Sequence, residues 1–94
     1  MIYVIAGNEP QAYEYINRKL EERILAGENL NKIDDYKYVH SANVLRGIED
    51  PHGVFIGTWR DREDIRDIIA ILMTASRAQN QALNGIWLEL NGLP

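Results

Sequence analysis

The sequence predicts an α/β domain built on a small, mostly parallel sheet of four strands. Two short apolar runs, Ile2–Ala6 and Val54–Ile56, each end at a glycine and have the composition of strands that are covered on both faces. Segments with helical periodicity lie between and after these runs. Strands that alternate with helices in this way are typical of a parallel sheet with crossover connections. The length of 94 residues fits a single domain over residues 1–94.

The first long helix is expected to follow the first strand directly. In the segment Asn8–Gln11, the asparagine can cap a helix, the proline suits the first turn, and the glutamine lies three positions after the cap. A helix over about residues 9–26 follows, and Gly27 can end it in a left-handed conformation. Apolar residues recur at helical spacing on one face, namely Ala12, Tyr13, Ile16, Leu20 and Ile24.

The middle of the chain is predicted to contain an edge strand and a short helical turn. The polar stretch 28–35 suits a surface turn. Tyr36–His40 then alternates in side-chain character, which indicates a strand with one exposed face. Ser41 can cap a short helical turn over Ala42–Leu45, and Gly47 can stop that turn.

The C-terminal third is predicted to hold the second long helix and the last strand. Asp61 can cap a helix that runs to about Leu83, with further acidic residues in the first turns, where the helix dipole favours them. Ile86–Leu90 alternates between apolar and other side chains, so we expect a half-covered strand there. The prediction therefore contains two long helices, one short helical turn and four strands.

The two apolar runs should lie inside the sheet and the two alternating runs at its edges. The strand orders 2-1-3-4 and 2-3-1-4 both satisfy this condition, and both give a Rossmann-like or flavodoxin-like arrangement. In the first order the winding reverses between strands one and three, so a crevice would open beyond their carboxyl ends. The residues expected at this crevice are Gly7, Asn8, His40, Gly57, Thr58 and Trp59.

A ferredoxin-like fold is the alternative architecture. It would pair the second and third strands antiparallel. The connection between them, residues 41–53, is 13 residues long, which exceeds the usual length of a hairpin loop.

The composition excludes several classes of function. With 14 acidic and 10 basic side chains the net charge is -4, which disfavours loose binding to nucleic acid or to anionic lipid. The absence of cysteine excludes disulfides, thiolate zinc sites and thiol catalysis, and it suits a reducing compartment. No apolar run approaches the length of about 20 residues that a membrane span needs. We therefore expect a soluble, cytoplasmic protein.

The segment Gly7–Pro10 lies where a phosphate-binding loop would lie, between the first strand and a helix. It contains one glycine and no lysine, Glu9 would stand among the free amides, and Pro10 lacks an N–H. Together with Leu45–Ile48 leading into Val54–Gly57, the layout resembles a P-loop ATPase core in topology but not in motif. This resemblance leaves a small-ligand or nucleotide-binding domain as the alternative function, with its ligand in the crevice.

The remaining polar clusters do not predict catalysis, a cofactor or a metal. His40 and Ser41 are neighbours in a strand, so their side chains point to opposite faces and cannot readily act as base and nucleophile. The segment Glu49–His52 has the composition of a solvated turn, and two histidines without helical pairing do not supply the ligand set of a zinc or iron site. Basic residues are interleaved with acids in a pattern typical of a solvated surface, at Arg60, Arg62 and Arg66.

The second long helix carries more apolar surface than one sheet face can cover. Its first stripe should face the sheet and consists of Ile65, Ile68, Ile69, Leu72, Ser76 and Leu83. A second stripe consists of Ile71, Ala75, Ala78 and Ala82. The first helix of the same chain could cover this second stripe, and so could a second copy. Trp87, on the outer face of the predicted last strand, adds another surface of the kind found at interfaces.

These observations predict a small, non-enzymatic protein–protein interaction module. Its expected interface residues are Ile71, Ala75, Ala78, Ala82 and Trp87. A two-fold homodimer is the commonest closed arrangement for such a surface. Compact domains of this kind are frequent among viral and mobile-element accessory proteins that bind a host factor, and this association gives the expected biological setting.

Overall fold

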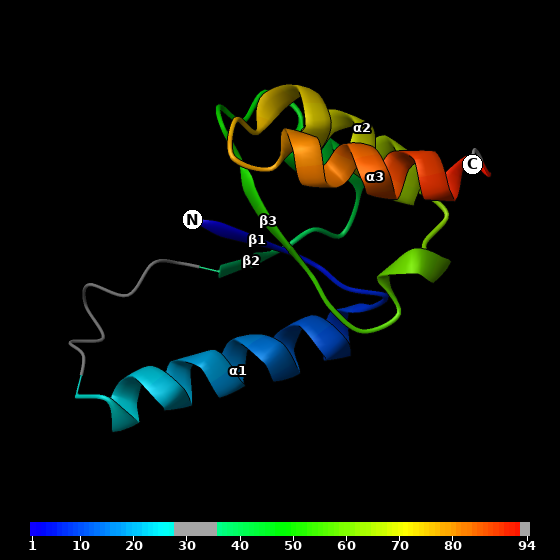
Figure 1. Ribbon diagram of the computed structural model, residues 1–94. Coiled ribbons are helices and arrows are strands. Elements are labelled where there is room, and N and C mark those ends of the chain that lie inside the picture. The colour runs from blue at the N-terminus through cyan, green and yellow to red at the C-terminus, as the bar shows by residue number, and fades with distance from the viewer. Residues whose placement is uncertain (28–35, 93–94) are drawn as a thin grey trace.

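The protein has an α/β fold in which helices cover both faces of a parallel sheet (Figure 1). The computed structural model describes residues 1–27 and 36–92. Three strands in this part of the chain form the sheet, namely β1 (Ile2–Ile5), β2 (Tyr36–Tyr38) and β3 (His52–Phe55). The α/β class is therefore confirmed. The predicted turn over residues 28–35 lies outside the described residues.

The strand order β2-β1-β3 agrees with the first three positions of the order 2-1-3-4 and excludes the order 2-3-1-4. Both outer strands run parallel to β1, with Tyr3 opposite Lys37 on one side and Gly53 on the other. The antiparallel pairing of a ferredoxin-like fold is therefore absent from the described sheet. β1 is the central strand, as predicted, and its side chains alternate between two cores. Tyr3 and Ile5 pack on one face, and Val4 packs on the other.

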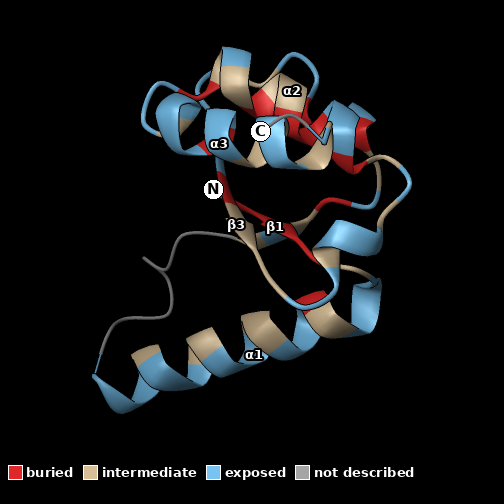
Figure 2. Ribbon diagram, turned by 45° about the vertical axis from the view of Figure 1, so that its right-hand side comes forward, coloured by how far each residue is buried: buried red, intermediate tan, exposed pale blue. Residues whose placement is uncertain are grey.

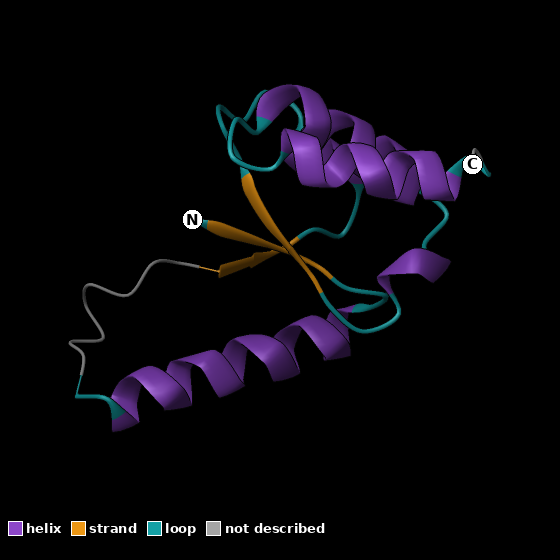
Figure 3. Ribbon diagram, viewed as in Figure 1, coloured by secondary structure: helices purple, strands orange, loops and turns teal. Residues whose placement is uncertain are grey.

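The predicted last strand is wrong, because Ile86–Leu90 belongs to a helix (Figure 3). The predicted single helix over residues 61–83 is also wrong. The chain instead forms a short 3₁₀ helix over Trp59–Asp61, then α2 (Ile65–Ala75) and α3 (Asn80–Leu90). The break comes at Ser76, whose backbone is extended, and it lets α3 fold back along α2.

Helical packing explains why the alternating pattern at residues 86–90 does not form a strand. As a strand, this segment would place Leu88 on the same face as Ile86 and Leu90. In the helix, Leu83 is 2% exposed, Ile86, Trp87 and Leu90 pack against the core, and Leu88 points outward with 36% exposure. A short apolar run fits both periodicities, and the tertiary contacts of Leu83 favour the helical one.

Because α3 is not a strand, β3 is an edge strand instead of a central one. Its apolar residues Val54 and Phe55, and the following Ile56, are only half-buried, whereas a strand covered on both faces was predicted. β2 forms the opposite edge, as predicted, and it carries the exposed Lys37.

The larger core lies between the sheet and the layer formed by α2, α3 and the short 3₁₀ helix Ala42–Leu45 (Figure 2). The predicted sheet-facing stripe is buried in this layer, and it includes Ile65, Ile68, Ile69 and Leu72. α2 approaches β3 closely at Gly53, where an added Cβ would lie 2.9 Å from Ile5 Cδ1 and 3.1 Å from Leu72 Cδ1.

The opposite face of the sheet is covered by α1 (Glu9–Leu25). Asn8 caps this helix as predicted, since its Oδ1 accepts a hydrogen bond from the Gln11 N–H at 3.0 Å. Ala12 is buried under Val4, but the far end of the helix extends past the sheet (Figure 1), and Leu25 is 87% exposed there. None of the described helices has the length and apolarity that crossing a membrane requires.

Candidate functional site

The carboxyl ends of β1 and β3 meet where a ligand crevice is expected in this type of sheet. The chain leaves β1 toward α1 on one face and leaves β3 toward α2 on the other (Figure 1). The connections therefore diverge between these two strands, and this divergence is the usual origin of a crevice. The loop residues at this point are Gly7 after β1 and Gly57 and Thr58 after β3.

The side-chain amide of Gln11 occupies this crevice. Its Oε1 accepts hydrogen bonds from the N–H of Gly7 at 2.9 Å and from the N–H of Thr58 at 3.1 Å. Its Nε2 lies 3.1 Å from the Thr58 hydroxyl oxygen and donates to it. The loops that could have bound a ligand are thus joined to each other through a residue of the same chain.

The two glycines are needed because the loops approach Gln11 so closely. A Cβ added at Gly57 would collide with Gln11 Oε1, and one added at Gly7 would collide with the Thr58 hydroxyl. Gly57 also has φ +59°, a conformation that favours glycine. Sequence reasoning assigned Gln11 only to the start of the helix. Its contacts with Thr58 join residues 47 positions apart, so no local sequence pattern predicts them.

The other predicted crevice residues lie around this centre without forming one site. Asn8 is used as the helix cap. Trp59 packs its ring against Phe55, with 5.0 Å between the ring centroids, and Arg60 lies over the Trp59 ring at 4.7 Å. His40 is exposed, two residues beyond the end of β2, and lines a separate shallow hollow.

That hollow has a volume of about 400 Å³ and is lined by Gly7, Tyr38, His40, Arg62, Glu63 and Asp64. The Arg62 side chain is only 6% exposed. Its Nη1 donates to the carbonyls of Ala6 at 3.1 Å and Val39 at 2.6 Å, and its Nε and Nη2 donate to the Asp64 carboxylate at 2.9 and 3.1 Å. Arg62 therefore joins the carboxyl ends of β1 and β2 to the segment before α2.

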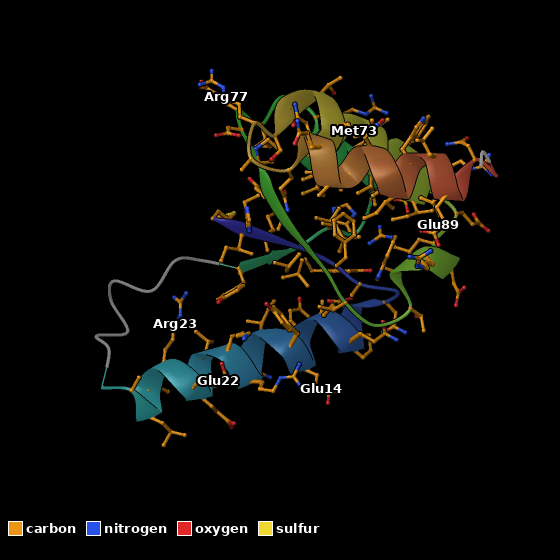
Figure 4. The ribbon with its side chains drawn as sticks, viewed as in Figure 1. Glu14, Glu22, Arg23, Met73, Arg77 and Glu89 are labelled. Atoms are coloured by element: carbon orange, nitrogen blue, oxygen red, sulfur yellow. The ribbon has the colours of Figure 1, made fainter. Side chains whose placement is uncertain are left out.

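Arg62 was predicted to belong to a solvated surface, and this interpretation is wrong for that residue. The guanidinium is held inside the protein because Asp64 neutralises its charge and two strand-end carbonyls accept hydrogen bonds from its N–H groups. Arg60 and Arg66 are exposed, as predicted. Arg60 forms an ion pair with Glu89 at 2.8 Å, and this guanidinium lowers the pKa of the Glu89 carboxyl below its ordinary value. Glu89 lies on the side of α3 that faces the 3₁₀ helix Trp59–Asp61 (Figure 4).

The four interface residues predicted on the second long helix do not form a continuous stripe, because that helix is broken, and Trp87, predicted on a strand, lies on α3. Ile71 and Trp87 are half-buried against the core, and Ala75 ends α2. Ala78, in the turn between the helices, and Ala82, on α3, are exposed. The helix that packs along α2 is α3, which neither sequence-based alternative anticipated. Binding of a partner at these five residues stays a prediction.

A hollow of about 350 Å³ lies on the outer side of the α2–α3 pair. It is lined by Met73, Asn80, Gln81 and Asn84. Met73, on α2, is labelled in Figure 4. Within residues 1–27 and 36–92, no cluster of three or more histidine, aspartate or glutamate side chains could hold a metal ion.

The outer edge of β3 is the remaining candidate site. Gly53 directs both of its backbone groups outward, and both are bonded to one side chain. Its N–H donates to Gln79 Oε1 at 2.9 Å, and its C=O accepts from Gln79 Nε2 at 2.7 Å. Two residues on, the N–H and C=O of Phe55 face the same way, because Ile56 donates inward to Ile5 at 3.0 Å. Phe55 has no outward hydrogen-bond partner among the described residues.

Comparison with protein-family models, curated proteins and solved structures gives no match to this chain. The geometry of the chain itself is therefore the basis for its proposed function.

Proposed function

We propose that the protein is a small, non-enzymatic interaction module that self-associates by pairing the outer edge of β3 with the same edge of a second copy. The observation that carries this proposal is the conflict between the composition of β3 and its position. Val54–Ile56 is an uninterrupted apolar run, which is typical of strands buried on both faces of a sheet, yet these residues lie at a sheet edge and are only half-buried. A neighbouring strand would complete their burial.

The two edges of the sheet differ in the way that this proposal requires. β2 is short and carries an exposed lysine, Lys37, which is a common protection against edge-to-edge pairing. Its two tyrosine rings also lie under arginines, Arg23 over Tyr36 at 5.5 Å and Arg62 over Tyr38 at 5.8 Å. Residues 53–57 of the β3 edge contain no charged side chain. An apolar edge strand without charged side chains favours pairing with another strand.

A second copy is the occupant that suits this edge best, because its own β3 supplies what the edge lacks. In an antiparallel pair centred on Phe55, the N–H of each Phe55 would donate to the C=O of the partner's Phe55. Val54 of one copy would then lie opposite Ile56 of the other, so apolar side chains would face each other. Both copies use the same patch, as a closed two-fold dimer requires.

The small-ligand alternative has less support from the contacts at the crevice. Gln11 already accepts the hydrogen bonds that the Gly7 and Thr58 amides could offer to a ligand. Arg62, the buried cation nearby, is bonded to Asp64 and to two carbonyls. A ligand would have to displace these internal bonds before it could bind.

Single-cysteine crosslinking tests the proposed dimer, because the natural sequence has no cysteine. In a hydrogen-bonded antiparallel pair the opposed Cα atoms lie about 5.5 Å apart, which is within the range that a disulfide can bridge. We expect Phe55→Cys to form a crosslinked dimer under mild oxidation. Lys37→Cys, on the opposite edge strand, is the matched control and should remain uncrosslinked.

Circular dichroism must first show that both variants are folded, since Phe55 also packs against Trp59. If folded Phe55→Cys crosslinks no faster than Lys37→Cys, the proposed edge pairing is wrong. Sedimentation of the natural protein as a monomer at every concentration up to the millimolar range would also contradict the proposal.

A further inference from the structure

We infer that Gln79 is a displaceable guard of the β3 edge, and that its release controls how tightly two copies pair. This inference rests on the proposed function, because it concerns the same edge. The Gln79 carboxamide accepts from the N–H of Gly53 at 2.9 Å and donates to the C=O of Gly53 at 2.7 Å. In a sheet, the C=O and N–H of one residue on the next strand make this same pair of bonds. Gln79 therefore occupies the place of a missing strand.

The backbone that carries Gln79 is held firmly. Ser76, at the end of α2, is 3% exposed, and its backbone N–H donates to Leu72 at 2.8 Å. The next residue, Arg77, donates its N–H to Asp50 Oδ1 at 2.9 Å, which fixes the turn to the loop before β3. Gln79 itself is half-buried. Rotation of its side chain away from Gly53 would break the two bonds to Gly53 and the bond that its Oε1 accepts from the Ser76 hydroxyl at 3.5 Å.

The Gln79 side chain blocks the backbone groups of Gly53 but not those of Phe55. With Gln79 bound, an incoming strand finds the outward groups of Phe55 free but those of Gly53 occupied. Rotation of Gln79 would release one further N–H and one C=O on each copy. The dimer would then gain backbone hydrogen bonding between Gly53 and Gly57 of the partner, which lies opposite it in this register. Each chain would lose the two Gln79–Gly53 bonds and the bond from the Ser76 hydroxyl to Gln79 Oε1 at 3.5 Å. Removal of Gln79 abolishes this competition, so it should favour the dimer.

The variant Gln79→Ala tests this inference against natural protein and against Gln81→Ala. Gln81 is an exposed glutamine two positions further along, so its replacement controls for the loss of a surface amide. We expect Gln79→Ala to lower the dimer dissociation constant in analytical ultracentrifugation by about tenfold or more, since each dimer no longer has to break two guarded edges. Gln81→Ala should leave the dissociation constant unchanged.

Hydrogen exchange at the Gly53 amide distinguishes a failure of the inference about Gln79 from a failure of the proposed edge dimer. At low concentration the amide should exchange about tenfold faster in Gln79→Ala than in natural protein, because its acceptor is gone. If the Gly53 amide exchanges faster but the dissociation constant is unchanged, the inference that Gln79 guards the edge is wrong and the proposed edge dimer is unaffected. If no variant dimerises, both proposals are wrong. A dimer of the Gln79→Ala variant should also crosslink when Phe55→Cys is added. If it does not, the dimer uses another surface, and the inference about Gln79 is wrong.

A second variant covers the case in which Gln79→Ala does not fold. Gln79→Glu keeps an acceptor for the Gly53 N–H but has no donor for the Gly53 C=O. We therefore expect its dissociation constant to be lower than that of natural protein. A dissociation constant equal to or higher than that of natural protein would overturn the inference.

Discussion

Replacing Gln11 by alanine tests whether this side chain holds the carboxyl ends of β1 and β3 together. The substitution removes the acceptor for two backbone N–H groups, that of Gly7 and that of Thr58. It also removes the donor to the Thr58 hydroxyl. Alanine is at least as good a helix former as glutamine, so any loss of stability comes from these contacts and not from the helix.

The expected loss follows from the surroundings of each bond. Gly7 is half-buried, so its N–H would lose a partner that water replaces only in part, whereas Thr58 is exposed and water can replace its partner. Together these changes should lower the free energy of unfolding by about 1–2 kcal/mol. In urea this corresponds to a fall in the unfolding midpoint of about 1 M for a small protein.

Urea unfolding followed by tryptophan fluorescence and circular dichroism measures this change. Asn17→Ala is the control, because Asn17 is exposed on the same helix, and its replacement should change stability by less than about 0.5 kcal/mol. If the Gln11→Ala protein unfolds at the same urea concentration as Asn17→Ala, the Gln11 side chain does not hold the ends of β1 and β3 together.

Three further predictions follow from the contacts of single side chains. Arg62→Ala removes a donor from two strand-end carbonyls and the counter-charge from the Asp64 carboxylate, so it should lower the free energy of unfolding in urea by about 2–3 kcal/mol. Leu83→Ala should cost about 2–4 kcal/mol in the same assay and Leu88→Ala much less, and the reverse order would contradict the helical assignment of this segment. In an NMR titration the Glu89 carboxyl should have a pKa below that of an ordinary glutamate, and Arg60→Gln should raise it. The small stabilisation from this pair is present at neutral pH and is lost as the pH falls through the lowered pKa of Glu89.

Local sequence patterns predicted the parts of the fold that depend on neighbouring residues. Asn8 and Pro10 mark the start of α1, and the short helical turn Ala42–Leu45 lies where Ser41 and Gly47 predicted it. The continuous apolar run of β1 indicated a central strand, and its position is confirmed. These features are encoded within a few residues of where they act.

The sequence could not predict features that depend on distant contacts. The break between α2 and α3 comes at Ser76 without a glycine or proline, and the helical periodicity continues across it. The apolar run Val54–Ile56 indicated a covered strand, but whether a neighbour exists depends on the fate of residues 86–90. Gln11 and Gln79 each bond to residues more than 25 positions away, at separations of 47 and 26. Only the folded chain brings these partners together.

Hydrogen exchange at the Phe55 amide, followed by NMR as the protein concentration is raised, tests the self-association most directly. Exchange should slow as dimers form, because this outward N–H gains an acceptor from the second copy, while exchange of the outward Tyr38 amide on the opposite edge should stay unchanged. Equal exchange of the Phe55 amide at all concentrations would contradict the proposed self-association.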